Sequence, residues 1–452
     1  MVHTFKSLNR YFMLDVNTCS LFEIDEVAAA VCPFVENGGD YKELYKRYNP
    51  EEVDETYSEL MLLKRTNQAF TNVDWSGEAI NPGHDIKAMC LHVSHDCELR
   101  CKYCFAATGC FHGERQLMTL ETGKKALDFL VKNSGKRKNL EVDFFGGEPL
   151  LNYDVVKGVM DYGKNVLGPK HKKNFRFTIT TNGMGLNEDI LKDFEEMYNV
   201  VVSVDGREKV HNNMRPDLNG KDTYLKIAEN ALKLKKSRNG KSYYVRGTYT
   251  SANTDFSKDV LHLADEGFDQ ISIGPVVLPD THKYALKEEH LEKLFDEYEK
   301  LAAEYVERRK KPDTWFNFFH FMIDMECGPC IAKRLTGCGA GNEYIAITPA
   351  GDIYPCHQFV GNEEYKMGNI HQKTFDKEMQ GLFAVNNVLS KPKCSDCWCK
   401  FFCSGGCAAN AVSFNGDMFT PYEMSCELQK KRTECALAIY SVEKENKQQK
   451  TQ

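Results

Sequence analysis

The stretch HVSHDCELRCKYCF, residues 92–105, decides how this chain is interpreted. It places Cys97, Cys101 and Cys104 at spacings of four and three residues, directly after an apolar run at residues 87–93. A β-rich apolar run of this length predicts a strand, so the cysteines are expected in a loop at its carboxyl end. Three thiolates can hold three irons of a [4Fe–4S] cubane and leave the fourth iron open.

Two other interpretations fit the same spacing. A structural zinc site needs four ligands, and His92, His95 or Cys110 would supply the fourth. A disulfide is the second alternative. It is disfavoured because the chain has 18 cysteines and its first residues, MVHTFKSLNRYFML, lack the pattern of a signal peptide. Reduced thiols, metal sites and a cytoplasmic location are therefore expected.

Composition excludes several partners. The 452 residues carry a net charge of −7 and no basic stripe, which disfavours nucleic acid. No apolar run approaches the roughly 18 residues of a membrane span. We therefore expect neither nucleic acid nor a membrane as a partner.

The middle of the chain alternates between two patterns. Amphipathic stretches lie at residues 120–132, 154–166 and 224–236. They fall between six apolar runs, at residues 87–93, 140–145, 175–181, 200–204, 243–250 and 270–276. This alternation predicts an α/β fold with parallel strands and crossover helices. Six units are too few for a closed eight-fold barrel.

Further motifs follow the predicted strands in order. Gly146-Gly147-Glu148-Pro149 ends the second run, and Thr181-Asn182-Gly183 ends the third. Ser203 lies on the fourth run, and Arg215 follows it in the string HNNMRP. Alone, a GGEP string is most often a turn and such an arginine is most often a solvated charge. Together they place polar and glycine residues at one edge of the sheet, where such folds bind their ligands.

The cysteine spacing and the order of these motifs resemble the radical S-adenosylmethionine (SAM) superfamily, whose typical fold is an open (β/α)6 partial TIM barrel. The resemblance implies that Cys97, Cys101 and Cys104 hold the SAM-binding cluster. It implies that Glu148 accepts a hydrogen bond from the methionine amino group and that Arg215 pairs with the methionine carboxylate. The full set of implied cofactor contacts is Tyr103, Gly146, Gly147, Glu148, Asn182, Ser203 and Arg215.

A second cysteine group lies near the C-terminus. Cys338 and Cys356 bracket a predicted β-hairpin with its turn at residues 349–352. Seven cysteines follow it; five of them share one spacing pattern, Cys394, Cys397, Cys403, Cys407 and Cys426, and Cys399 is an extra residue inside that pattern. A zinc ribbon is the alternative, but seven cysteines exceed one tetrahedral site. The order resembles the SPASM extension of peptide-modifying radical SAM enzymes, which implies two auxiliary [4Fe–4S] clusters and three in total. The implied ligands are Cys394, Cys397, Cys403 and Cys426 for the distal cluster and Cys338, Cys356 and Cys407 for the nearer one. Cys330, or Cys327, is the candidate for a fourth ligand of the nearer cluster.

The first 80 residues form a third unit. Strands are predicted at residues 10–17 and 20–24, and helices at residues 25–35, 41–48 and 50–65. This order resembles the winged-helix-like peptide-recognition domains of enzymes that modify ribosomal peptides, which bind a leader segment as an added strand. A DNA-binding winged helix and a packing appendage are the alternatives. The mixed charges of the helices disfavour DNA.

Three domains are therefore expected: a leader-recognition domain at residues 1–80, a radical SAM barrel at 86–310 and a SPASM domain at 311–440. The set resembles the thioether-forming maturases of six-cysteine (SCIFF) ribosomal peptides. That resemblance implies hydrogen abstraction by a 5′-deoxyadenosyl radical and a cysteine-to-carbon crosslink. It also implies a cysteine-rich precursor peptide and an electron donor such as flavodoxin or ferredoxin as partners.

Three alternatives to this function remain. A formylglycine-forming sulfatase maturase and a carbon–carbon crosslinking maturase are the enzymatic ones. A zinc-dependent peptide-binding or regulatory protein is the non-enzymatic one.

Overall fold

The computed structural model describes residues 1–73, 83–326 and 331–451. Its N-terminal unit is a three-stranded antiparallel sheet in the order β1-β2-β3 followed by helical segments. The elements are β1 (Val2–Ser7), β2 (Arg10–Asp15), β3 (Ser20–Ile24), α1 (Glu26–Asn37), the 3-10 helix η1 (Tyr41–Lys46) and α2 (Pro50–Arg65). The hairpin predicted at residues 10–17 and 20–24 is confirmed as β2 and β3, whereas β1 was not predicted.

Local sequence explains where these helices begin. The Asp25 carboxylate accepts a hydrogen bond from the Ala28 amide at the start of α1. The Asn49 side chain accepts one from the Glu51 amide at the start of α2, where Pro50 occupies the first turn. Both are typical N-terminal caps, because they satisfy amides that have no partner inside the helix.

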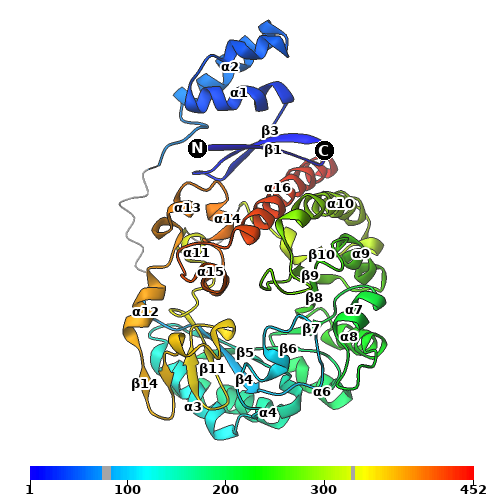
Figure 1. The fold of residues 1–452 in the computed structure, drawn as a ribbon, viewed down its shortest axis with the longest axis vertical. Helices are drawn as coiled ribbons and strands as arrows, with labels where there is room; N and C mark the ends of the chain where they lie inside the picture. The colour runs from blue at the N-terminus through cyan, green and yellow to red at the C-terminus, as the bar shows by residue number, and fades with distance from the viewer. Residues whose placement is uncertain (74–82, 327–330, 452) are drawn as a thin grey trace.

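The six predicted central strands are all present and all parallel to their neighbours. They are β4 (Ala88–Ser94), β5 (Asn139–Gly146), β6 (Asn174–Thr181), β7 (Asn199–Ser203), β8 (Tyr243–Tyr249) and β9 (Gln270–Pro275). Figure 1 shows helices along the outside of this curved sheet. They include α3 (Leu120–Asn133), α4 (Tyr153–Asp161), α6 (Glu188–Asp193), α7 (Glu208–Met214), α8 (Tyr224–Arg238) and α9 (Ser257–Asp265). The partial barrel is therefore confirmed.

The sheet extends beyond these six strands at both edges. Beyond the last of the six predicted runs, at residues 270–276, β10 (Asn317–Phe318) pairs in parallel with β9. At the other edge β11 (Tyr344–Ile347) pairs in parallel with β4 and forms the predicted hairpin with β12 (Asp352–Tyr354). The cysteine-rich C-terminal part is thus joined to the barrel through a continuous sheet.

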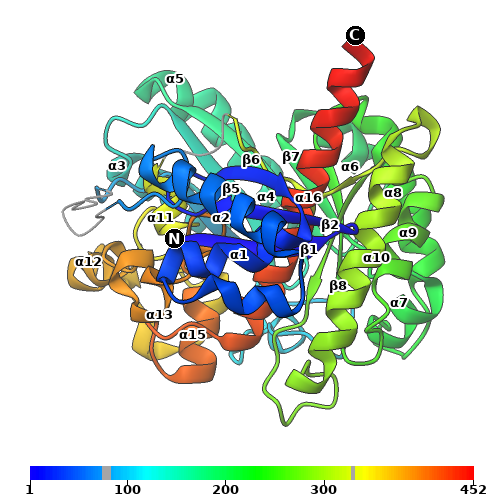
Figure 2. The ribbon, with the colours of Figure 1, turned by 90° about the horizontal axis from the view of Figure 1, so that it is seen from above.

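Helix α16 (Glu423–Thr451) connects the three parts of the chain. It packs along α10 (Leu291–Arg309) and against β1, as Figures 1 and 2 show. Near its far end the Arg10 guanidinium donates to Glu445 of the helix at 2.8 Å and to Glu23 of β3 at 3.0 Å. Closer to its start Arg432 bonds the ring of His320 at 2.9 Å, beside the barrel.

The core of the barrel lies between the sheet and the outer helices. The strands bury alternate residues there, for example Phe175, Phe177 and Ile179 of β6. Their intervening residues face the barrel interior, because side chains alternate along a strand. Among the described helices, none combines the length and the apolar character needed to cross a bilayer.

Candidate active site and cysteine clusters

The loop after β4 carries the three cysteines predicted to hold the SAM-binding cluster. Its backbone amides at residues 100 and 102 donate to the carbonyls of residues 216 and 214, at 2.8 and 2.9 Å. The cysteine loop is therefore fixed against the segment that contains Arg215. The Asn182 amide group also lies 3.7 Å from the Cys97 sulfur.

A cavity of about 140 Å³ opens beside this loop. Nine of the ten residues predicted for this site line it: Cys97, Cys101, Tyr103, Cys104, Gly146, Gly147, Asn182, Ser203 and Arg215. The tenth, Glu148, does not. Residues that are up to 118 positions apart in sequence, Cys97 and Arg215, thus meet at one place.

The glycine pair at the end of β5 allows two backbone segments to touch. Gly146 has φ +130°, and a Cβ there would lie 2.1 Å from the Ser94 carbonyl oxygen. A Cβ at Gly147 would lie 2.2 Å from the Asp96 carbonyl oxygen. Both positions therefore require glycine, because any side chain would push β5 away from the cysteine loop. The pair also lines the cavity, as the predicted approach to a cofactor requires.

Glu148 lies behind the cavity and is almost fully buried. Its carboxylate accepts hydrogen bonds from the Thr181 hydroxyl and the Asn182 amide, both at 2.7 Å, and from the Leu150 amide at 3.0 Å. Burial, followed by the nearby Glu98, raises its pKa to about 7. A carboxylate offers about four acceptor positions, so one remains for the predicted amino group. In the structure Glu148 chiefly orients the loop at residues 181–183.

Tyr103, Asp205 and Arg215 form a buried polar network. The Tyr103 hydroxyl donates to the Asp205 carboxylate at 2.7 Å and accepts from an Arg215 Nη at 2.8 Å. The Arg215 Nε is buried and has no partner among the described atoms. A buried unpaired donor is costly, so an acceptor is expected there. The donor lies beside the cavity and suits a carboxylate such as that of SAM.

Asp205 is a site residue that sequence reasoning missed. Asp205-Gly206 directly follows the predicted strand at residues 200–204. The signal that could have found it is its equivalence to Thr181-Asn182-Gly183, which follows the preceding strand in the same way.

Burial governs the protonation of the cysteines in this loop. It raises the pKa of Cys97 to about 12 and that of Cys101 to about 11. The Arg215 charge opposes the rise at Cys101. Thiolates in such a site need a metal to stabilise them, because metal binding is coupled to loss of the proton.

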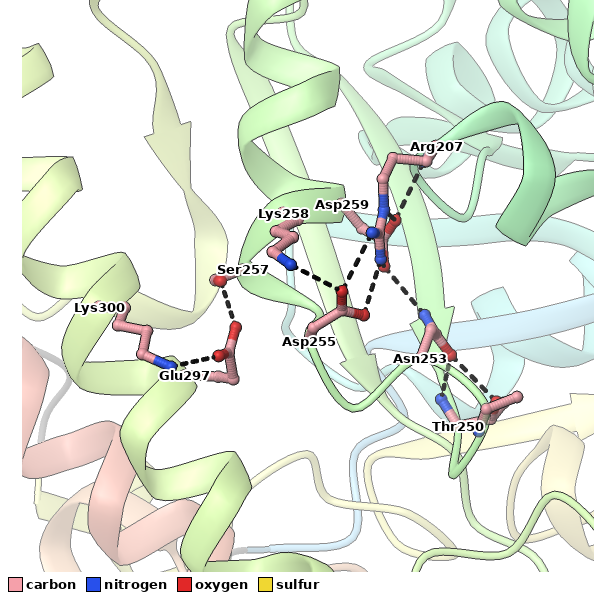
Figure 3. A network of polar contacts seen from close by, with 10 residues as sticks. Arg207, Thr250, Asn253, Asp255, Ser257, Lys258, Asp259, Glu297 and Lys300 are labelled. Carbon is pink, nitrogen blue, oxygen red and sulfur yellow. Dashed lines mark hydrogen bonds and ion pairs between the residues drawn. The ribbon is translucent and has the colours of Figure 1, made fainter.

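A second polar network holds the segment that leads to Arg215, and Figure 3 shows it. Arg207 donates through Nε to Asp259 at 2.7 Å and through its Nη atoms to Asp255 at 2.8 and 3.0 Å. The Asn253 amide group donates to Asp259 at 3.0 Å. Because Arg207 directly precedes α7, these contacts tie that helix to the start of α9.

Replacing Arg207 by alanine is expected to destabilise the protein strongly. The Asp259 side chain is fully buried and would lose its charged partner, at a cost of about 2–4 kcal/mol, below the value for a pair buried on both sides. Lys258→Ala is the matched control, since Lys258 is exposed in its ion pair with Asp255 and should cost less than about 1 kcal/mol. Urea unfolding measures both variants. Equal effects would contradict the prediction.

The C-terminal cysteines gather in two groups. Cys394, Cys397, Cys403 and Cys426 line a cavity of about 340 Å³. The extra Cys399 borders the same cavity, but its thiol hydrogen-bonds the Thr433 hydroxyl at 3.4 Å. The four cysteines are those that the resemblance implies for the distal cluster.

The second group contains Cys338, Cys356 and Cys407. Burial, and then the nearby Cys407 and Cys338, raise the pKa of Cys356 to about 12. The predicted fourth positions, Cys327 and Cys330, lie outside the described residues. Which of these seven cysteines bind iron stays a prediction, but the structure brings them together in the two predicted sets.

Lys391 lies between these two groups and was missed by sequence reasoning. Its ammonium is buried and donates to the Gly405 carbonyl at 2.7 Å. Burial lowers its pKa, and cysteines of both groups oppose that effect: Cys394, Cys403, Cys407 and Cys426. A lysine near several cysteines gave no recognisable pattern in sequence, because its partners are up to 35 residues away.

The zinc alternatives fit these arrangements less well. Within the described parts of the chain, no three His, Cys, Asp or Glu side chains converge closely enough to hold one metal ion. A zinc site needs its ligands about 2.0–2.3 Å from a single ion. The cysteines of an iron–sulfur cluster bind separate irons and need not converge in this way.

Comparison with known families agrees with the site. Residues 91–245 match the radical SAM superfamily, and residues 338–398 match the SPASM iron–sulfur cluster-binding domain. The chain therefore contains a radical SAM domain and, in its C-terminal part, a SPASM domain. These two domains imply bound SAM and iron–sulfur clusters.

Individual relatives have several activities. The chain is 28% identical to a cysteine-type anaerobic sulfatase-maturating enzyme of Clostridium novyi, over 70% of this chain and 86% of the relative. It is 24% identical to the radical SAM cyclopropyl synthase TigE of Paramaledivibacter caminithermalis, over 78% of this chain and 74% of that one. The crystal structure of Streptococcus suis SuiB bound to its precursor peptide SuiA has a TM-score of 0.52 at 17% identity. That match covers 91% of this chain and 95% of SuiB, and it supports the fold alone.

Proposed function

We propose that this protein installs an intramolecular thioether crosslink, from a cysteine sulfur to a carbon of an acceptor residue, in a ribosomally made cysteine-rich peptide. Bound SAM and its cluster supply the radical that removes a hydrogen atom from carbon. Forming the carbon–sulfur bond also removes a proton and an electron from the peptide thiol. Cys338, Cys356 and Cys407 would hold an auxiliary cluster able to accept that electron.

The observation that carries this proposal is the free edge of the N-terminal sheet. β3 pairs with β2 on one side, and no strand of the described chain pairs with its other side. An open edge can bind an extended peptide through backbone hydrogen bonds. The sheet packs through β1 against α16, which also packs along α10 (Figure 2). A leader bound at this edge would therefore lie on the same body as the barrel. SuiB, a structural neighbour, has been crystallised with a precursor peptide.

In the rest of the site, the residues of this chain position and shield the reaction. Tyr103 and Arg215 would hold the carboxylate of SAM, with Arg215 itself fixed by the ion pair to Asp205 at 3.9 Å. Cys97, Cys101 and Cys104 would hold its cluster, and Cys394, Cys397, Cys403 and Cys426 would hold the distal auxiliary cluster. Three clusters in total are proposed, with a flavodoxin or ferredoxin as the electron donor.

Mass spectrometry tests the proposal directly. Anaerobically reconstituted protein is given SAM, a reductant and the cysteine-rich peptide encoded beside its gene. The expected product has lost two hydrogens and has one cysteine that no longer reacts with an alkylating reagent. Deoxyadenosine without any change in the peptide would reject the proposal and keep the radical SAM assignment.

Two other products have support among the relatives. Formylglycine formation is favoured by the similarity to the sulfatase-maturating enzyme. Carbon–carbon crosslinking is favoured by the similarity to the cyclopropyl synthase. A carbon–carbon product is recognised in the same experiment, because all of its cysteines stay alkylatable. Formylglycine formation is tested in a second reaction that contains a sulfatase-type peptide in place of the cysteine-rich one.

Removal of the leader is expected to weaken substrate binding without changing the chemistry. A peptide that lacks its leader loses the backbone hydrogen bonds to β3, so KM should rise at least about tenfold while kcat stays close to its original value. Steady-state kinetics with the full and the truncated peptide measure this. An equal KM for the two peptides would mean that the β3 edge does not bind the leader.

A further inference from the structure

The barrel interior carries polar side chains that the proposed clusters and SAM do not use. They project from four strands of the barrel, at positions that alternate with core residues: Asp143 of β5, Thr178 of β6, Arg246 of β8 and Ser272 of β9. The Thr178 hydroxyl donates to the Asp143 carboxylate at 2.8 Å. An interior of this kind suits a polar substrate group, because buried polar groups need partners.

Arg246 is the most unusual of these residues. Its strand neighbours Val245 and Tyr249 belong to the core, so Arg246 lies on the opposite face, toward the interior. It is paired in register with Ser203, which lines the predicted SAM cavity, and with Ser272. It is exposed although it projects into the barrel, which shows that the space in front of it is open.

The Arg246 charge acts on buried groups from three other elements. Burial raises the pKa of Asp143 to about 6, and a hydrogen bond and the Arg246 charge oppose this rise. Burial, and then Arg246, lower the pKa of His357 to about 4. Burial, Arg432 and Arg246 lower the pKa of His320. The guanidinium therefore faces the common interior of β5, the segment after β12 and the segment after β10.

The Arg246 guanidinium forms no direct contact with a carboxylate of the described residues. Within residues 1–73, 83–326 and 331–451, Arg246 makes no hydrogen bond and no ion pair, whereas Arg207 and Arg215 are bound by carboxylates. An interior cation that is kept without a partner is available to bind an acceptor on a ligand.

The other charges of the interior indicate which ligand fits. The Asp143 carboxylate projects into the same interior from β5, and the Arg246 charge reaches it. The interior thus presents a donor at Arg246 and an acceptor at Asp143, on two different strands. A peptide group, with its carbonyl oxygen and its N–H, matches this arrangement better than an anion or a cation does.

The position of Arg246 is suitable for holding the peptide residue that reacts. Ser203, the register partner of Arg246, lines the SAM cavity, and His357 directly follows Cys356 of the three-cysteine group. The His357 ring lies 5.7 Å from that of Phe105, which directly follows Cys104. Arg246 therefore faces the space between the two predicted cluster sites.

We propose that Arg246 and Asp143 hold a main-chain amide of the peptide residue that gives up its hydrogen, with the carbonyl oxygen on the Arg246 guanidinium and the N–H on the Asp143 carboxylate. The inference rests on the proposed function, because it assumes a peptide in the barrel. It assigns substrate-binding roles to two residues outside every motif of the SAM and cluster sites. No electron or proton is transferred to either residue.

Arg246→Gln, with the precursor peptide and reconstituted full-length protein, tests the inference. Loss of a charged hydrogen bond should raise KM by about 10- to 100-fold. It should also raise the amount of deoxyadenosine formed per crosslink, because a poorly held residue lets the radical be lost. Arg246→Lys should recover part of both losses. Asp143→Asn serves as the second variant. A depsipeptide, with an ester in place of the amide at the modified residue, lacks the N–H proposed to bind Asp143. This substrate change should therefore reduce crosslinking by the wild type more than crosslinking by Asp143→Asn.

Arg176→Gln is the matched control. Arg176 lies on the same face of β6 as Thr178, two residues earlier and nearer the start of the strand, paired with Glu141 at 3.7 Å and stacked over Tyr198. The Arg176→Gln variant should have the wild-type KM and the wild-type ratio of deoxyadenosine to crosslink. Iron content and circular dichroism equal to those of the wild type show that each variant is folded.

The outcomes separate this inference from the proposed function. If the wild type crosslinks the peptide and Arg246→Gln does so with unchanged KM and ratio, the inference is wrong and the proposed function stands. If Arg246→Gln affects only peptides with an acidic residue at the modified site, the guanidinium binds a side chain and the main-chain form is rejected. If the wild type leaves the peptide unmodified, the proposed function fails and the inference fails with it.

Discussion

Simultaneous replacement of Cys97, Cys101 and Cys104 by alanine is expected to reduce deoxyadenosine formation by at least about 1,000-fold, because the three thiols act as one unit. The seven other cysteines predicted to bind iron lie in two separate groups and should keep their iron. Iron should therefore fall from about twelve to about eight atoms per chain if all three clusters are cubanes. Anaerobic reconstitution, iron determination and chromatography of deoxyadenosine measure both quantities.

Cys110→Ala is the control for this variant. Cys110 was a candidate zinc ligand from sequence, and in the structure its thiol donates to the Ala107 carbonyl at 3.1 Å. Its loss should change neither iron content nor SAM cleavage. Retained cleavage in the triple variant would disprove the assignment of the cysteine loop.

Replacement of Cys356 by alanine is expected to abolish crosslink formation while SAM cleavage continues. Deoxyadenosine formation should continue, because the SAM cavity contains none of the three-cysteine group. Crosslinked peptide should fall below detection, because the site proposed to accept the electron is lost. Comparing the two products in one reaction mixture gives the result without any assumption about enzyme concentration.

Cys399→Ala is the matched control, since Cys399 is a buried cysteine of the same SPASM part and is bonded to Thr433. It should form crosslink and deoxyadenosine in the ratio of the wild type. Crosslink formation by Cys356→Ala at the wild-type rate would instead show that this group does not take part in the chemistry.

Sequence patterns predicted the central sheet well because its strands are long and apolar. All six runs became β4 to β9, and the motifs after them met at one cavity. Two strands at the edges were missed. β10 has only two residues and is specified by pairing with β9 and not by its own sequence. β1 has six residues, but it depends on pairing with β2 and packing against α16.

The residues that form the site were easier to predict from sequence than the role of each residue within it. Glu148 belongs to the site, but most of its bonding capacity serves the chain itself, through residues 150, 181 and 182. Lys391 and Arg246 belong to no motif, because their surroundings are created only by folding. A side chain whose partners come from distant strands leaves no local pattern in sequence.

The contacts of α16 define the distance between the N-terminal sheet and the barrel, which a peptide bound at both places would have to span. Arg432 of this helix reaches His320 beside the barrel, and Glu445 binds the N-terminal sheet through Arg10, so 13 residues of one straight helix separate the two places. At 1.5 Å per residue the separation is about 20 Å along the helix axis. An extended chain covers that distance with about six residues. The helix thus fixes the separation between the N-terminal sheet and the barrel. If the leader docks on that sheet as proposed, a precursor with fewer residues between its leader and its first modified position could not reach the barrel.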